Sequence, residues 1–346
     1  YWMRTRINYK YKDLTDEQAL YTGWKNKCED EKIRLDYDTF DELDKALQDK
    51  IIAEYPLITF REDKYSKDIR LVSDGLTQQQ RVLQSIMISE YRQMVAEKEI
   101  NLAIKPIIMF KNPKGIKNVD TSFDNFVKQI EKLSVSNISD IFSQSSIKAI
   151  SSLYELVKDD LERFLNRLKI SFAKEKCLVI YSTSADKEEK LKLLNSLEDV
   201  KNPIRAVFAV NVLNEGWDVL NLYDIVKLDE AKKATTATTS EAQLIGRGAR
   251  YYPFEYKQED KYKRKFDSDL SSPLRVLEEM YFYSVNDNEY IKSLKEALKK
   301  EGLRDDNEED NIVEFKIKES FLKDDMYQSG YVYLNEQVLI NQKQEI

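Results

Sequence analysis

Short hydrophobic runs alternate with longer amphipathic stretches through the middle of the chain. The runs are 107–110, 178–181, 206–210 and 225–228, and runs of this length and composition are typical of strands buried on both faces of a sheet. Hydrophobic residues recur at helical spacing in four stretches, which are 77–99, 123–133, 145–170 and 186–198. Strands and helices in this order predict an α/β fold with a parallel sheet and right-handed crossovers.

The regions on either side of this alternation follow other patterns. Before it, we expect a helix over 41–52, ended by Pro56, and a short strand at 57–60. After Pro253 the pattern predicts helices at 272–282 and 287–301, an acidic run at 304–310 and half-exposed strands at 313–317 and 331–334. We therefore divide the chain into an N-terminal segment (1–76), a sheet domain (77–255) with a helical insertion near 119–170, and an α+β extension (256–346).

Composition and charge exclude several classes of site. The formal net charge is −7 with a pI near 5.2, so nucleic acid would have to bind a local patch and not a basic coat. The absence of histidine excludes Ser-His-Asp and Cys-His nucleophiles and mixed Cys/His zinc sites. Cys28 and Cys177 are expected to be buried thiols of a reduced, cytoplasmic protein, and no apolar run is long enough to predict a membrane span.

The eight glycines exclude the familiar nucleotide-binding loops. No two of them are five apart and none is followed by lysine, so no Walker A loop occurs in these 346 residues. The G-x-G at 246–248 is followed by Tyr251 where a dinucleotide fingerprint needs its third glycine. A nucleophile elbow, G-x-S-x-G, is also absent.

The first motif that could carry chemistry directly follows a predicted buried strand. Residues 209–219 read Ala-Val-Asn-Val-Leu-Asn-Glu-Gly-Trp-Asp-Val. Ligands bind at the carboxyl ends of strands in doubly wound sheets, Gly216 permits close backbone approach, and Asp218 can accept hydrogen bonds from a ribose or an arginine. An ordinary turn with a polar cap is the alternative interpretation.

The second motif places two arginines and an amide on one predicted helical face. Residues 240–250 read Ser-Glu-Ala-Gln-Leu-Ile-Gly-Arg-Gly-Ala-Arg, so Gln243, Arg247 and Arg250 stand at i, i+4 and i+7. Two guanidiniums on one stripe suit a polyphosphate, whereas a solvated basic face is the alternative. The glycines at 246 and 248 favour the polyphosphate, since each costs a helix about 1 kcal/mol and offers no evident structural gain.

Together the two motifs resemble motifs V and VI of the second RecA-like domain of superfamily 2 helicases. Gln243, Gly246, Arg247 and Arg250 match motif VI, Q-x-x-G-R-x-x-R, at every defined position. The sequence Leu-Asn-Glu-Gly-Trp-Asp at 213–218 is most similar to the Res subunits of type III and type I restriction systems. The resemblance covers roughly 77–335, and the ATP- and Mg²⁺-binding motifs I–III are absent from this sequence.

The resemblance implies the C-terminal motor half of an ATP-dependent double-stranded DNA translocase. Arg247 and Arg250 would be catalytic, and Gly216, Asp218, Gln243 and Gly246 would contact ATP, whose Mg²⁺ ligands would come from a first RecA-like domain. Nucleic-acid contacts are expected from residues on loops at the same rim, namely Lys111, Asn112, Lys114 and Asn211. The basic run 257–265 is a second candidate. The implied partners are DNA and a modification (methyltransferase) subunit, with no membrane partner.

Departures from the family pattern leave other functions open. Many relatives carry a motif V threonine that contacts the nucleic-acid backbone, and this chain has Val210 or Asn211 there. Glu314-Phe315-Lys316 resembles part of a nuclease motif, but we interpret it as a solvated strand ahead of a missing nuclease domain. A non-enzymatic scaffold and a helicase outside restriction are the alternatives. This chain alone is expected to be inactive.

Overall fold

The computed structural model describes most of the chain between residues 57 and 303. The described ranges are 57–73, 75–112, 116–180, 187–199, 201–209, 219–228, 235–269, 271–284 and 288–303. Several predicted features lie outside them: the helix at 41–52, the acidic run at 304–310, and the strands at 313–317 and 331–334 with Glu314 and Lys316.

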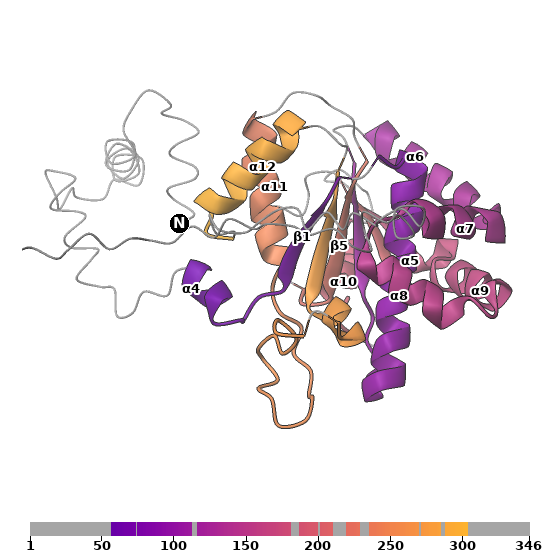
Figure 1. Cartoon of the computed structure of the whole chain (residues 1–346). Helices are drawn as coiled ribbons and strands as arrows, with labels where there is room; N and C mark the ends of the chain where they lie inside the picture. The colour runs from indigo at the N-terminus through magenta and orange to yellow at the C-terminus, as the bar shows by residue number, and fades with distance from the viewer. Residues whose placement is uncertain are drawn as a thin grey trace, which may run out of the picture. The chain divides into compact units, whose positions relative to one another are not determined.

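A single parallel sheet of six strands lies at the centre of the described residues (Figure 1). In chain order the strands are β1 (Asp68–Val72), β2 (Ile107–Lys111), β3 (Cys177–Ile180), β4 (Ala206–Ala209), β5 (Leu222–Lys227) and β6 (Glu279–Tyr283). They are arranged β1-β6-β5-β2-β4-β3, and every neighbouring pair is parallel. The predicted α/β class and the four predicted strands are confirmed, and all six carboxyl ends lie along one edge.

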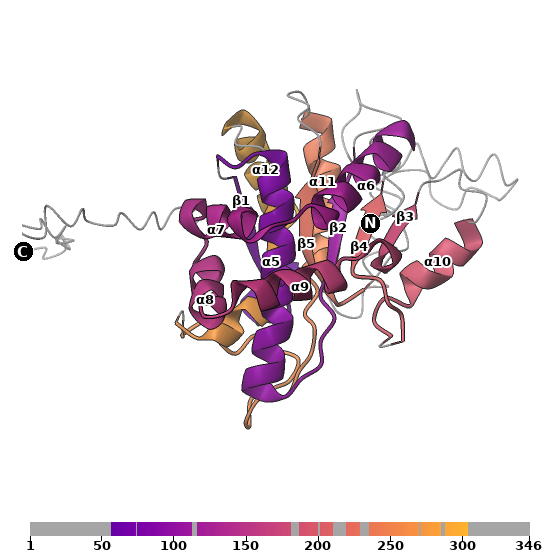
Figure 2. The same cartoon turned by 90° about the vertical axis from the view of Figure 1, so that its right-hand side faces the viewer.

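Helices cover both faces of this sheet (Figures 1 and 2). Alternate strand residues point to opposite sides, so Ile108 and Phe110 join one core cluster while Ile107 and Met109 join the other. The first face packs on α5 (Gln78–Ile100), α6 (Ile116–Glu131), α7 (Val135–Gln144), α8 (Lys148–Val157) and α9 (Leu161–Ser171). The second packs on α10 (Lys187–Asn195), α11 (Thr235–Gly248) and α12 (Asn288–Lys300). These three layers fit a RecA-like fold.

The long helix predicted over 77–99 is confirmed, and its two ends have clear local causes. The Thr77 hydroxyl accepts a hydrogen bond from the backbone N–H of Gln80, and the Gln80 side chain accepts one from the N–H of Thr77 in a capping box. At the other end Asn101 takes the left-handed conformation, with φ 51°, and its N–H donates to the carbonyl of Ala96. Helix α5 therefore begins at Gln78 and ends at Ile100, and it packs between the sheet and helices α7, α8 and α9.

Helices occupy the region predicted to be a helical insertion, but their bounds differ from the predicted ones. The single helix predicted over 145–170 is wrong, since α8 ends at Val157 and α9 begins at Leu161. The carboxylate of Asp160 accepts a hydrogen bond from the backbone N–H of Arg163, so this aspartate starts a new helix where hydrophobic spacing alone suggested continuity. Helix α7 was not predicted. The first helix of the insertion also begins earlier than the predicted 123–133.

Two predictions of secondary structure were wrong in type. The strand predicted at 57–60 is the short helix α4 (Leu57–Glu62). The helix predicted at 272–282 is the 3₁₀ helix η2 (Pro273–Leu277) followed by β6. Every residue of β6 is buried, so aromatic β-formers there gain from burial on both faces of the sheet. Because β6 is buried on both faces, its sequence lacks the alternation of polar and apolar residues by which a strand is distinguished from a helix.

The sheet extends beyond both boundaries proposed for the central domain. Strand β1 comes from the segment assigned to 1–76, and β6 from the extension assigned to 256–346. They pair with each other over five residues of each strand. The RecA-like layer is therefore wider than 77–255, and the segment before residue 77 helps to build it.

Candidate functional site

Helix α11, which carries the motif VI residues, runs antiparallel to the strands. At its middle, Glu241 contacts the last residues of β2 and β5. At its end, a Cβ added to Gly248 would meet Leu222 and Met280, which lie at the amino ends of β5 and β6. Seven residues of helix, about 10 Å at 1.5 Å per residue, separate these two positions. The sequence-predicted site residues are thus divided between opposite edges of the sheet.

The carboxyl edge holds a cluster of charges centred on Glu241. Its carboxylate lies 2.6 Å from Lys111 Nζ and 3.4 Å from Lys227 Nζ, and it accepts a hydrogen bond from the Tyr290 hydroxyl. The Glu241 side chain is 1% exposed and that of Lys111 is 15% exposed. Lys111, predicted to contact nucleic acid, is therefore held in a largely buried ion pair, and its DNA-binding role stays a prediction.

Asn112 follows Lys111 and is buried, not presented on an open loop. Its Nδ2 donates to the carbonyl of Phe110 over 3.1 Å, and its backbone N–H donates to the carbonyl of Ala209 over 3.0 Å. The Oδ1 atom has no hydrogen-bond partner among the described residues. This amide therefore presents an unpartnered acceptor beside the end of β4. Lys114, the other predicted contact on this loop, lies outside the described residues.

The two glycines of motif VI have a structural reason that the sequence did not reveal. A Cβ on Gly246 would lie 2.9 Å from Leu303 Cδ1, and one on Gly248 would lie 2.7 Å from Met280 Cε. Both contacts are shorter than real Cβ contacts, so each glycine allows α11 to pack closely on its neighbours. Contrary to the prediction, these glycines have a role in packing, and their presence no longer favours the polyphosphate over a structural role.

The arginines lie at the far end of α11 from Glu241. Gln243, Gly246 and Arg247 are partly exposed on the helix, whereas Arg250 follows the helix end. Arg250 forms an antiparallel bridge with Ser66, and it is exposed between the buried residues Ala249 and Tyr251. The prediction that Gln243, Arg247 and Arg250 share one helical face was therefore wrong for Arg250, because the helix ends at Gly248.

Lys67 caps the end of α11, and sequence reasoning missed it. Its side chain is fully buried, and Nζ donates to the carbonyls of Leu220, Leu222 and Gly248 over 2.6, 2.8 and 2.9 Å. Burial lowers the pKa of Lys67 well below its usual range, and the Arg92 guanidinium adds to this effect. In the sequence, Lys67 is one of several charged residues in a polar segment, and no signal distinguishes it.

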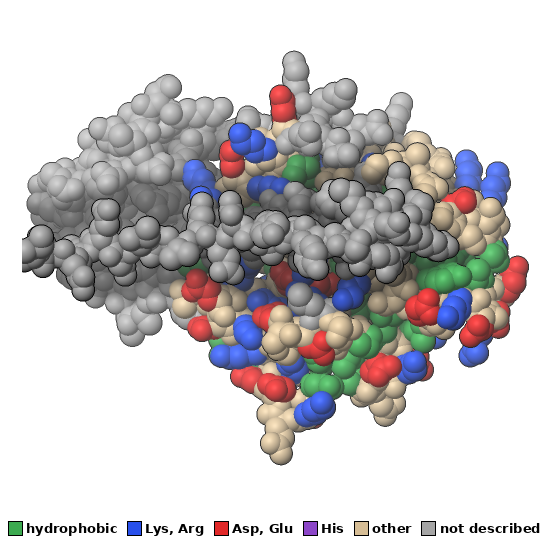
Figure 3. Space-filling model, in the orientation of Figure 1, with side chains coloured by type: hydrophobic (Ala, Val, Ile, Leu, Met, Phe, Trp, Pro, Cys, Tyr) green, Lys and Arg blue, Asp and Glu red, His purple; other side chains and the backbone are tan. Residues whose placement is uncertain are grey.

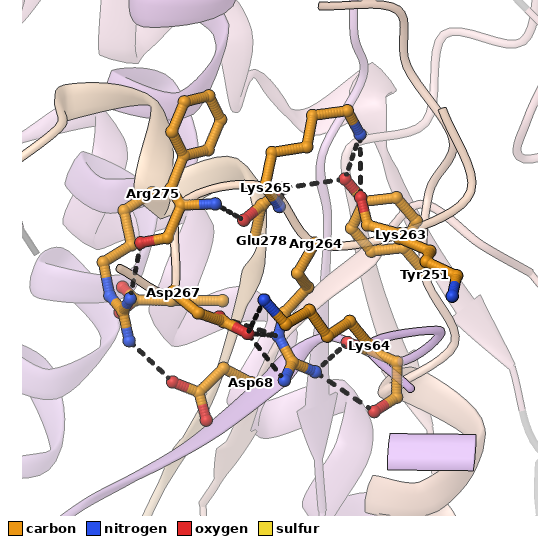
Figure 4. Close-up of polar contacts among 12 residues, drawn as sticks. Lys64, Asp68, Tyr251, Lys263, Arg264, Lys265, Asp267, Arg275 and Glu278 are labelled. Atoms are coloured by element: carbon orange, nitrogen blue, oxygen red, sulfur yellow. Dashed lines mark hydrogen bonds and ion pairs between the residues drawn. The ribbon is translucent and has the colours of Figure 1, made fainter. Parts of the chain in front are cut away.

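The last two cations of the basic run 257–265, Arg264 and Lys265, contact other residues of the protein (Figure 4). The guanidinium of Arg264 bonds the carbonyl of Ser66 and the carboxylate of Asp267. Lys265 Nζ donates to the Tyr251 hydroxyl over 2.9 Å and lies 4.2 Å from the centre of the Phe254 ring. Arg264 and Lys265 therefore make contacts within the protein. In the remainder of the run Lys257 and Lys261 are exposed and Lys263 is partly buried, and the role of 257–265 in DNA binding stays a prediction.

Glu278 completes this arrangement by holding the residue that follows Arg250. Its carboxylate accepts hydrogen bonds from the Tyr251 hydroxyl at 2.8 Å and from the backbone N–H groups of Lys265 and Phe266 at 2.7 and 2.9 Å. Burial raises the pKa of Glu278, and these hydrogen bonds oppose that rise. Both neighbours of Arg250 are therefore held by hydrogen bonds, Ala249 by the backbone N–H of Lys67 and Tyr251 by the carboxylate of Glu278.

On the face seen in Figure 3 the described acidic and basic side chains are interspersed, and they form no large patch of a single charge.

None of the helices in the described ranges is both long and apolar enough to cross a bilayer. Those ranges also hold no group of three or more Cys, Asp or Glu placed to bind a metal ion. The motif V residues Asn211, Gly216 and Asp218 lie outside the described residues.

Three comparisons connect the chain to known proteins. A family model named HI_1054_N, described as an N-terminal region, matches residues 237–307, which span α11 to α12. The chain is 33% identical over 215 residues to a probable type III restriction-modification enzyme HindVIP Res subunit from Haemophilus influenzae. It is 37% identical over 115 residues to an uncharacterized protein from the same organism.

These matches cover parts of longer proteins. The aligned regions represent 55% of this chain and 41% of the Res subunit, and 33% of this chain and 25% of the uncharacterized protein. The resemblance predicted from motifs V and VI is confirmed at the level of the protein class: over more than half its length the chain is similar to a type III Res subunit, and its parallel sheet fits a RecA-like domain.

Proposed function

We propose that this chain forms the second RecA-like half of an ATP-driven double-stranded DNA translocase, acting as the restriction subunit of a type III or type I-like system. The similarity to a Res subunit and the six-stranded parallel sheet support this assignment. A DNA modification (methyltransferase) subunit is the expected partner, and the cytoplasm the expected compartment. ATP would bind between this domain and a first RecA-like domain that supplies the phosphate loop.

The observation that carries the proposal is the placement of Arg250. Its side chain is exposed, while its neighbours Ala249 and Tyr251 are buried and anchored through Lys67 and Glu278. A guanidinium on a fixed backbone is suited to stabilising charge that develops during phosphoryl transfer, because little reorganisation is needed at the moment of reaction. Arg247, three residues earlier, would contact the phosphates or pair with Asp218.

The chain segment after motif V supports a shared ATP site. Leu220, two residues beyond Asp218, and Gly248, at the end of α11, both accept a hydrogen bond from Lys67 Nζ. This common contact ties the segment that follows Asp218 to the end of the motif VI helix. In the proposal, Gly216 and Asp218 contact the ribose side of ATP and Gln243 contacts the nucleotide from α11. Gly246 allows α11 to pack against Leu303 and so keeps Arg247 in place.

The Mg²⁺ that accompanies ATP would be held largely by the first RecA-like domain. The described residues offer exposed guanidinium near the end of α11 but no cluster of three carboxylates or thiolates for a metal. In the proposal, this half of the divided site supplies cations to the phosphates, and the other half supplies the metal ligands. The same division explains why we expect no ATP hydrolysis by this chain alone.

DNA contacts are proposed for the loops at the carboxyl edge of the sheet. Lys111 is the last residue of β2 and Asn112 follows it, while Lys114 and Asn211 come after β2 and β4 in the sequence; β2 and β4 are adjacent strands. A phosphate oxygen that binds Lys111 must compete with the Glu241 carboxylate, so DNA binding through this residue should be weak. One phosphate contact adds only about −0.9 to the slope of log K against log salt concentration.

A complementation assay tests the proposal. ATP hydrolysis would be measured for residues 1–346 alone, for a first RecA-like domain alone, and for the two together with double-stranded DNA. We expect activity only in the mixture or in one protein that carries both domains. Robust DNA-stimulated hydrolysis by residues 1–346 alone would overturn the divided site. No hydrolysis by the two-domain protein would favour a scaffold, while hydrolysis without any partner subunit or DNA cleavage would favour a helicase outside restriction.

A further inference from the structure

The contacts of Lys67 join the end of α11 to the start of β5. Of the three carbonyls that receive its ammonium hydrogens, one belongs to Gly248, the last residue of α11. The other two belong to Leu220 and Leu222, at the start of β5. An ammonium has three N–H donors, and here each has an acceptor within 2.9 Å.

The backbone beside Lys67 continues the same attachment. Its N–H donates to the carbonyl of Ala249 over 2.6 Å, and Ser66 forms an antiparallel bridge with Arg250. Three consecutive residues, 248, 249 and 250, are therefore held by two residues that precede β1. On the other side, Ser66 is itself fixed, because the Arg264 guanidinium donates to its carbonyl.

A lysine is physically suited to this position. The last carbonyls of a helix lack partners within the helix and form the negative end of its dipole, so a cation there is stabilising. The ammonium also lies 4.5 Å from the centre of the Tyr223 ring, which adds a cation–π contact. A neutral apolar side chain of the same length would leave three buried carbonyls without this donor, so Lys67 is more than a packing residue.

Its burial excludes a direct chemical role. The Lys67 side chain is 0% exposed and all three donors are engaged, so it can reach neither solvent nor a nucleotide. Its effect on any reaction must pass through the residues that it holds. The nearest exposed residue among these is Arg250, which is covalently joined to Ala249 and bridged to Ser66.

We propose that Lys67 is the positioning residue for Arg250, so that a segment outside motifs V and VI sets the geometry of the catalytic arginine. The inference rests on the proposed function. It goes beyond that function by assigning part of the ATP site to the residues immediately before β1. Without the ammonium, the carbonyls of Leu220, Leu222 and Gly248 lose their shared donor. The backbone contacts of residues 66 and 67 with Arg250 and Ala249 remain, so we expect the end of α11 to be held less firmly and the guanidinium of Arg250 to be placed less precisely.

The test compares three variants in the complete protein that carries both RecA-like domains. Lys67→Met removes the ammonium and keeps the side-chain length. Lys105→Met is the control for the loss of a lysine that donates to backbone carbonyls: Lys105 Nζ donates to those of Asp199 and Asn202 at 2.7 and 2.5 Å, which lie outside α11, although Lys105 is less buried than Lys67. Arg250→Ala reports directly on the arginine. If Lys67→Met does not fold, Lys67→Gln, which keeps neutral donors, replaces it.

Two readouts are measured for each variant. The first is amide hydrogen exchange in the segment 248–251, which we expect to accelerate roughly tenfold or more in Lys67→Met and not in Lys105→Met. The second is the kinetics of DNA-stimulated ATP hydrolysis. Misplacement of about 1 Å can cost on the order of 10²-fold in rate, so we expect kcat to fall by about 10–100-fold with KM for ATP nearly unchanged.

The outcomes separate this inference from the proposed function. Faster exchange together with reduced kcat in Lys67→Met, with Lys105→Met normal in both, supports the inference. Unchanged exchange at 248–251 overturns it, as does normal kcat in Lys67→Met while Arg250→Ala is inactive. Normal kcat in Arg250→Ala overturns the proposed role of the arginine first, and the positioning role with it. A combined fall in the kcat of Lys67→Met and Lys105→Met shows general destabilisation and also overturns the inference.

Discussion

Replacing Glu241 by alanine removes the carboxylate that two lysines share at the carboxyl edge of the sheet. Lys111 and Lys227 approach it to 2.6 and 3.4 Å, and their side chains are only 15% and 6% exposed. Both ammonium groups remain after the substitution, with their shared counter-charge gone. The Tyr290 hydroxyl, which donates to Glu241, also loses this acceptor.

The cost of Glu241→Ala follows from burial. Breaking a buried ion pair by removing one partner costs about 3–5 kcal/mol, mostly because the remaining charge stays desolvated. Lys111 is partly exposed and can turn toward water, so we expect a value near the lower end, about 3 kcal/mol. For a domain of 150–250 residues this corresponds to a fall in Tm of roughly 6–12 °C.

The assay is thermal unfolding followed by circular dichroism, with Glu155→Ala as the matched control. Glu155 lies 2.6 Å from Lys158 Nζ, the same separation as in the Glu241–Lys111 pair, but both side chains are exposed, at 66% and 43%. An exposed pair is screened by water, so this control should leave Tm unchanged. Equal Tm values for the two variants would refute the reasoning that burial of the Glu241 cluster makes it stabilising.

Two further predictions concern packing and burial. Gly248→Ala should not gain the roughly 1 kcal/mol of helix propensity that alanine offers, as followed by chemical denaturation, because the end of the Met280 side chain must move away from the new Cβ. Gly75→Ala, with no atom within 4 Å of its Cβ, should meet no such clash, and a full gain of about 1 kcal/mol in Gly248→Ala would contradict the close packing. Burial raises the pKa of Cys177 to about 12, so iodoacetamide should leave this thiol unmodified in the native protein at pH 8. Because the thiol stays protonated in the folded state above the unfolded pKa near 9, stability should fall between pH 9 and 12, and Cys177→Ala should fall less over this window; equal pH dependence would contradict the burial effect.

The hydrophobic pattern was enough to predict strands β2 to β5 but not β1 and β6, which are neighbours on one side of the sheet. The runs that became β2 to β5 are short and apolar, and the prediction of parallel pairing followed from the helices between them. Strand β1 contains two charged residues, Asp68 and Arg70, so no apolar run marks it. In the structure Asp68 forms an ion pair with Arg275, and Arg70 forms one with Glu279. Such pairing is a tertiary feature that local sequence does not carry.

The candidate site shows the same limit. Motif spacing identified Arg247 and Arg250, yet it placed them on one helical face, because nothing in the local sequence shows that α11 ends at Gly248. The packing role of Gly246 and Gly248 could not be predicted for a related reason. The side chains that a Cβ would meet at these positions belong to Leu303 and Met280, which are distant in sequence. The residues that fix the helix end, Lys67 and Glu278, look like ordinary surface charges until the fold brings them together.

The most direct test of the central claim is the turnover number of Arg250 variants in the complete protein with double-stranded DNA. Loss of an arginine that stabilises the transferring phosphoryl group typically costs about 10³–10⁵ in rate, and lysine does not restore the planar guanidinium. We therefore expect Arg250→Ala and Arg250→Lys to lose kcat by this order, with Tm within about 2 °C of the parent because the side chain is exposed. A stable Arg250→Ala variant with near-normal kcat would contradict the account.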